Sequence, residues 1–121
     1  MLKTSTRSLG RVVIVDCYGR IVMGEETASL RQQVKELLDQ SQQIVLNLAD
    51  VNYIDSSGLG TLVGLYTSAR NVGGEIKLAA LTARVKDVLQ ITKLGSIFEF
   101  YDTPEQAAAS FGGTMAMKRA G

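Results

Sequence analysis

Short apolar segments and segments with helical periodicity alternate along this chain, and their order constrains the fold more than any other feature of the sequence. Residues 44–48 are apolar at nearly every position, which is typical of an inner strand covered on both faces. Helical spacing is clearest after that strand, where Leu59, Leu62, Val63 and Tyr66 form one stripe. Strands and helices in alternation predict an α/β fold.

The predicted elements begin with two strands, after which helices and strands take turns. The strands are residues 12–18, 21–23, 44–48, 76–80 and 97–101. The helices are residues 25–40, residues 57–71, a segment capped by Thr82, and residues 104–111. The first two strands are expected to form a hairpin that turns at Gly19-Arg20. We therefore expect a mixed sheet of four to five strands with about four helices.

The length of the chain, 121 residues, is that of one domain. Its composition, with 45% hydrophobic and 21% charged residues, is typical of soluble globular proteins. We expect the domain to span residues 11–111, after an N-terminal extension at residues 1–10. Residues 112–121 contain a glycine pair and a basic pair but no apolar stripe, which predicts a flexible C-terminal tail.

The charges and the missing residue types exclude several classes of function. Thirteen basic and twelve acidic residues leave a net charge of +1, too little to bind nucleic acid through its phosphates. No apolar run is long enough for a membrane span or a signal peptide, so we expect a cytoplasmic protein without a membrane partner. A single cysteine, Cys17, and the lack of histidine argue against disulfides, the usual zinc sites and a Ser/His/Asp triad. We expect no metal, no cofactor and no catalytic residue.

The segment with the most chemical content is residues 55–60, Asp-Ser-Ser-Gly-Leu-Gly, directly before a predicted helix. The first N–H groups of a helix have no intrahelical partners, and the helix dipole favours an anion there. A phosphate on Ser56 or Ser57 is therefore favoured at this position. The plainer interpretation is that Asp55, Ser56 or Ser57 only caps the helix.

Two glycines in the first turn of this helix indicate a contact surface. Gly58 and Gly60 each cost about 1 kcal/mol of helix stability relative to alanine, and capping alone leaves them unexplained. Their missing side chains let another protein's backbone or a nucleotide approach the serine hydroxyls closely. The residues expected to contact a partner around Ser56 are Asp55, Ser57, Gly58, Leu59 and Gly60.

The segment Ile44–Leu59 resembles the STAS domain family, specifically the bacterial anti-sigma factor antagonists. The most specific elements are residues 51–60, Val-Asn-Tyr-Ile-Asp-Ser-Ser-Gly-Leu-Gly, and Gly73-Gly74-Glu75 after the helix, which occur in the family's order. The resemblance covers about residues 11–111 and implies a single STAS-like domain.

The resemblance implies a partner-switching mechanism. In such a mechanism, the unphosphorylated antagonist binds an anti-sigma factor serine kinase, which then releases the sigma factor. The kinase phosphorylates the antagonist to end the complex, and a phosphatase resets it. The family's phosphorylated serine directly follows the aspartate, which points to Ser56 here. Ser57 is then expected to cap the helix, and Asp55 to orient the neighbouring hydroxyl or a partner's donor.

The turn at residues 19–22 departs from the family's pattern of charges. The prototypes often carry an acidic residue after a Gly-x-Leu turn, where this chain has Val22. Arg20 reverses the local charge. We expect it to contact a partner and to select one that differs from the partner of the prototypes. Basic residues on helix surfaces are usually solvated, although they can meet an acidic partner; here these are Arg84, Lys86 and Lys93. Tyr53 and Tyr66 are expected in the core or at its rim.

Two other functions stay open at this point. A constitutive scaffold or interaction module in a signalling assembly, not phosphorylated, would use the serines only to cap the helix. An enzyme with a serine nucleophile is disfavoured, because no histidine exists and no lysine lies near the motif in sequence.

Overall fold

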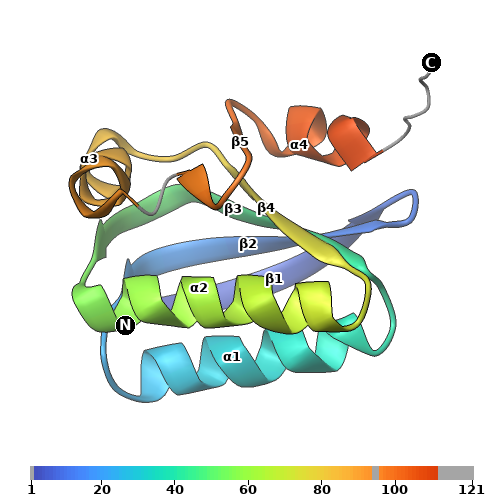
Figure 1. The fold of residues 1–121 in the computed structure, drawn as a ribbon, viewed down its shortest axis with the longest axis horizontal. Coiled ribbons are helices and arrows are strands. Elements are labelled where there is room, and N and C mark those ends of the chain that lie inside the picture. The colour runs from blue at the N-terminus through green and yellow to red at the C-terminus, as the bar shows by residue number, and fades with distance from the viewer. Residues whose placement is uncertain (1, 94–95, 112–121) are drawn as a thin grey trace.

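The computed structural model describes residues 2–93 and 96–111, and these form an α/β domain (Figure 1). The strands are β1 (Leu2–Leu9), β2 (Val12–Ile21), β3 (Gln43–Ile54), β4 (Glu75–Ala79) and β5 (Phe100–Tyr101). The helices are α1 (Glu25–Leu38), α2 (Ser56–Asn71), α3 (Ala83–Thr92) and α4 (Pro104–Phe111). The prediction of a mixed sheet of up to five strands with four helices is confirmed for the described residues.

One five-stranded sheet with the order β1-β2-β3-β4-β5 organises the molecule. Strand β1 is antiparallel to β2, and every later neighbour is parallel. In Figure 1, α1 and α2 lie below the sheet, whereas α3 and α4 lie above it, α3 over the C-terminal end of β3. The parallel strands β2 and β3 therefore end together at the left-hand side of the figure, where α2 begins.

Strand β3 is the inner strand that its apolar sequence predicts. Its residues Ile44 and Leu46 are buried in the large core cluster that includes the apolar faces of α1 and α2. Val45, which points to the other face, packs in a second cluster with Ala107 and Ala108 of α4. Burial on both faces explains why nearly every position of this strand is apolar.

The predicted opening hairpin is wrong. Strand β2 runs without interruption from Val12 to Ile21, and Gly19 lies inside it at an irregularity of the β2–β3 register. The hairpin instead joins β1 to β2, with Gly10 at a φ of 65° in the turn, a left-handed conformation that favours glycine. The sequence does not distinguish the two cases, because glycine is found both in hairpin turns and at irregular positions within strands.

Residues 2–9, which lie in the predicted N-terminal extension, form the edge strand β1. A buried polar group connects this strand to the rest of the sheet. The carboxylate of Asp16 in β2 accepts hydrogen bonds from Arg7 in β1 at 2.9 Å and from Asn47 in β3 at 2.7 Å. Burial by itself raises the pKa of Asp16, but the hydrogen bonds from Arg7 and Asn47 outweigh it and the pKa is lowered.

The predicted tail, residues 112–121, lies outside the described residues.

The predicted connection after the inner strand is also wrong, because β3 continues to Ile54. Its second half pairs with the end of β2, so that Ile54 lies opposite Ile21. Ala49, Asp50 and Asn52 are exposed there and have low strand propensity, which made the segment look like a loop. The longer strand carries the chain directly into the start of α2.

Candidate functional site

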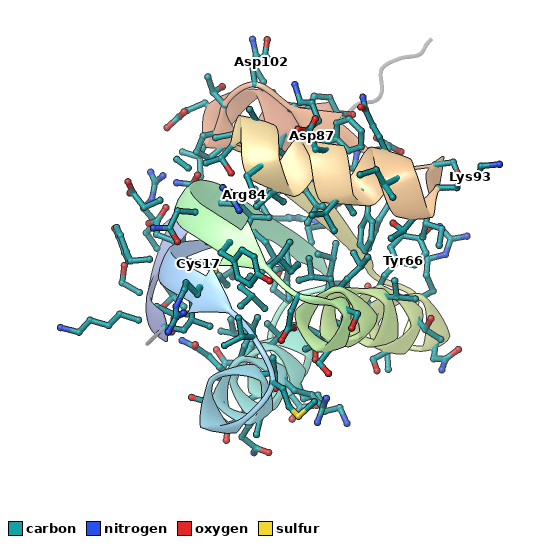
Figure 2. The ribbon with its side chains drawn as sticks, turned by 90° about the vertical axis from the view of Figure 1, so that its left-hand side faces the viewer. Cys17, Tyr66, Arg84, Asp87, Lys93 and Asp102 are labelled. Carbon is teal, nitrogen blue, oxygen red and sulfur yellow. The ribbon has the colours of Figure 1, made fainter. Side chains whose placement is uncertain are left out.

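The segment 55–60 lies at the edge of the sheet where β2 and β3 end, the end that faces the viewer in Figure 2. Ser56 is the first residue of α2, and its side chain is exposed. Among the described side chains, which do not include those of Glu25 and Glu26, none forms a hydrogen bond with the Ser56 hydroxyl. An exposed hydroxyl can enter the active site of another protein.

Asp55 caps helix α2, which is one of the three caps that the motif allows, whereas the family resemblance favours Ser57. Its Oδ1 accepts a hydrogen bond from the N–H of Gly58 at 2.7 Å, while its Oδ2 accepts one from the N–H of Met23 at 3.1 Å. Its own N–H donates to the carbonyl of Ile21 at 3.3 Å. Asp55 therefore joins the end of β2, the link to α1 and the start of α2.

The electrostatics of the cap follow from these hydrogen bonds. The backbone N–H groups of Gly58 and Met23 hold the pKa of the Asp55 carboxyl below its ordinary value, so that the group is ionised at neutral pH. Asp55 accepts these bonds itself and does not orient the Ser56 hydroxyl in this structure. Ser57 is half-buried, and its carbonyl accepts a hydrogen bond from the Thr61 hydroxyl at 3.0 Å. The cap of α2 is thus made by Asp55 and not by either serine.

The two glycines of the motif have different roles. A Cβ on Gly58 would lie 2.0 Å from the carbonyl oxygen of Ile21, a distance that no side chain can adopt. Gly58 is therefore required by the close approach of α2 to the end of β2, and not by a partner. A Cβ on Gly60 would meet open space, and this residue is exposed. Only Gly60 keeps the surface role predicted for both.

Leu59 also differs from its predicted role as a contact residue. It is only 3% exposed and belongs to the large core cluster, so its side chain is not available to a partner. The exposed surface around Ser56 therefore does not include every residue of the motif. Of the predicted set, Ser56 and Gly60 are exposed, while Asp55 and Ser57 are partly exposed.

Arg20 reaches the same edge of the sheet as the motif. It is exposed near the end of β2, and it lies opposite Tyr53 of β3 in the parallel register. Tyr53 is 39% exposed, and the guanidinium carbon of Arg84 lies 5.9 Å from the centre of its ring. Figure 2 shows Arg84 of α3 beside the end of β3. The sequence could not bring these three residues together, because their proximity depends on the register of β2 against β3 and on where α3 packs.

Other chemically reactive groups lie away from this edge or in the core. The thiol of Cys17 is buried, and desolvation, with a smaller effect of the nearby Asp16, raises its pKa to about 12, which makes it a poor nucleophile. Tyr66 packs edge-to-face against Phe98, with ring centres 5.3 Å apart. Within the described part of the chain, no three histidine, cysteine or acidic side chains gather as metal ligands do. In the same part, no helix has both the length and the apolar composition of a membrane span.

Comparison with known proteins gives a family for this arrangement. The family model described as the STAS domain matches residues 3–107. An anti-sigma-B factor antagonist from Bacillus subtilis is 36% identical over 70 residues, which cover 58% of this chain and 64% of that protein, just under two thirds. A protein of the same name from Listeria monocytogenes is 40% identical over 83 residues, covering 64% of this chain and 73% of that protein.

The fold itself is also found in solved structures. The crystal structure of an anti-sigma factor antagonist from Mycobacterium paratuberculosis matches with a TM-score of 0.80 and 22% sequence identity. The match covers 91% of this chain and 93% of that one. At this identity the likeness establishes the fold alone.

Proposed function

The chain belongs to the STAS domain family, and we propose that it is an anti-sigma factor antagonist whose partner binding is controlled by phosphorylation of Ser56. The names of the relatives from Bacillus subtilis and Listeria monocytogenes support the antagonist role. The observation that carries the site assignment is the exposed Ser56 side chain, at the first residue of a helix that Asp55 already caps.

In the proposed cycle, the unphosphorylated chain binds an anti-sigma factor serine kinase, and the kinase then releases its sigma factor. The Ser56 hydroxyl oxygen attacks the γ-phosphorus of ATP in the kinase, its proton passes to a base of the kinase, and ADP leaves. A phosphatase later hydrolyses the phosphoserine to serine and inorganic phosphate. The chain contributes the hydroxyl and its position, so it acts as a substrate and a binding protein, not as an enzyme.

Phosphorylation is expected to change binding far more than folding. A phosphate adds about −1.5 to −2 charges at Ser56, next to the ionised carboxylate of Asp55. The start of α2 offsets part of this repulsion, because a helix N-terminus favours an anion by about 0.3–1 kcal/mol at an exposed site. The fold therefore tolerates the phosphate, whereas an interface that packs on Ser56 has to desolvate it.

The experiment is phosphorylation by the anti-sigma factor kinases encoded in the same genome, each purified and supplied with ATP. Mass spectrometry of the digested product locates the phosphate. We expect one phosphate on Ser56, none on Ser56→Ala, and normal phosphorylation of the matched variant Ser57→Ala. Equal phosphorylation of Ser56→Ala and wild type would contradict the site. If no kinase modifies or binds the wild type, the constitutive scaffold becomes the better account.

A further inference from the structure

Three residues from separate elements form a basic and aromatic patch near Ser56, which we call the Tyr53 patch: Arg20, Tyr53 and Arg84. Arg20 in β2 lies opposite Tyr53 in β3, and Arg84 in α3 lies over the Tyr53 ring at 5.9 Å. Tyr53 is two residues before the capping Asp55 and three before Ser56. The patch therefore occupies the same edge of the sheet as the proposed phosphorylation site.

No ion pair of the two arginines of the Tyr53 patch is found among the described side chains, which do not include those of Glu25 and Glu26. The ion pairs between described side chains are formed by Arg7, Arg70 and Lys77, and none of them includes Arg20 or Arg84. Asp87, one turn after Arg84, lies on the upper side of α3 in Figure 2, away from the end of β3. Asp55, the nearest carboxylate in sequence to Tyr53, is occupied by two backbone N–H groups.

The composition of the Tyr53 patch is that of a binding surface. Tyrosine and arginine are, with tryptophan, enriched among the residues that dominate the energy of protein interfaces. An arginine stacked on a ring keeps its N–H donors free at the edge for a carboxylate. Arg84 is such a cation at Tyr53, and the exposed Arg20, opposite Tyr53 in the sheet, adds a second positive charge that attracts an anion.

We propose that the Tyr53 patch binds an acidic segment of the protein that docks on Ser56, with carboxylates facing Arg20 and Arg84. This inference rests on the proposed function and specifies the chemistry of the partner's surface. It also gives phosphorylation a second effect on binding. A phosphate on Ser56 brings negative charge to the edge where the acidic segment lies, so it repels that segment as well as opposing desolvation.

The test is isothermal titration of the anti-sigma factor kinase that phosphorylates the wild type, using the unphosphorylated chain. The double variant Arg20→Glu/Arg84→Glu reverses the charge of the patch. The matched control Lys35→Glu/Lys86→Glu makes the same change in net charge on exposed residues of α1 and α3 outside the patch. Circular dichroism and thermal melting confirm that both double variants are folded.

We expect the patch variant to bind at least ~10-fold more weakly than the wild type and the control to bind within about twofold of it. The affinity of the wild type is also expected to fall more steeply with added NaCl than that of the patch variant. A patch variant that binds like the wild type, while Ser56→Asp still weakens binding, would overturn the inference and leave the proposed function intact. A wild type that binds no kinase would contradict both.

Discussion

The starts of helices α2 and α4 are both capped by a short polar side chain, but they are built differently. At α4, the Thr103 hydroxyl accepts a hydrogen bond from the N–H of Gln106 at 3.0 Å, a contact within one turn. At α2, the carboxylate of Asp55 binds the N–H of Gly58 and also that of Met23, which is 32 residues away in sequence. The first cap stabilises one helix, whereas the second also ties α2 to the rest of the domain.

This difference explains how Ser56 can be both exposed and well positioned. The N–H groups of Met23 and Gly58 are bound by one ionised carboxylate, and the carbonyl of Ile21 lies against Gly58. The Ser56 side chain therefore projects from a helix start that is held by contacts with Met23, Gly58 and Ile21. A hydroxyl held in this way loses little conformational entropy when a partner binds it.

The largest effect is expected from filling the close contact at Gly58. Gly58→Ala places a methyl group 2.0 Å from the carbonyl oxygen of Ile21, so that α2 or the end of β2 has to move. We expect a loss of at least about 3 kcal/mol in the free energy of unfolding, measured by urea denaturation.

The matched control is Gly60→Ala, in the same turn but facing open space. It is expected to stabilise the protein by about 0.5–1 kcal/mol, because alanine favours the helix. Similar stability of the two variants would show that α2 does not approach β2 as closely as described.

The second effect compares the two caps directly. Asp55→Ala removes a cap with two hydrogen bonds, and we expect it to lower the free energy of unfolding at pH 7 by about 2 kcal/mol. Thr103→Ala removes a single local bond and is expected to cost about 1 kcal/mol or less. Urea denaturation of both variants measures the difference, and a larger loss for Thr103→Ala would contradict the role given to Asp55.

The contribution of Asp55 is also expected to depend on pH. Because its pKa is lower in the folded than in the unfolded protein, its stabilising effect is present above its unfolded pKa of about 3.9 and is lost as the pH falls through the folded pKa. The gap in stability between the wild type and Asp55→Ala should therefore narrow below about pH 4. Asp16 and Glu99, whose pKa values are also lowered, are unchanged in both proteins and cancel in this difference.

The same two helix starts show what the sequence can predict. Residues 104–111 form α4 as predicted, because the hydroxyl of Thr103 accepts a hydrogen bond from the N–H of Gln106 within one turn and Pro104 suits the first helical position. The cap by Thr82 on α3 was predicted for the same reason and is confirmed. The fold class and the position of α2 followed from hydrophobic periodicity, which depends only on the faces of each element.

The parts of the site that the sequence could not predict depend on distant segments. The sequence leaves open which of Asp55, Ser56 and Ser57 caps α2, because the contact of Asp55 with Met23 requires the end of β2 to lie beside the start of α2. Gly58 looked like a position kept open for a partner, although the close neighbour is the backbone of Ile21. The Tyr53 patch depends on the pairing of Arg20 in β2 with Tyr53 in β3. The predicted hairpin ends the strand before Arg20, so it does not include this pairing.

The central claim is that phosphate on Ser56 controls partner binding without disturbing the fold. The direct measurement is isothermal titration of the modifying kinase with the unphosphorylated protein and with protein phosphorylated only on Ser56, together with thermal melts of both forms. We expect the affinity to fall by at least ~100-fold on phosphorylation while the melting temperature changes by no more than about 3 °C. Equal affinities of the two forms, or a phosphorylated form that is unfolded, would contradict the claim.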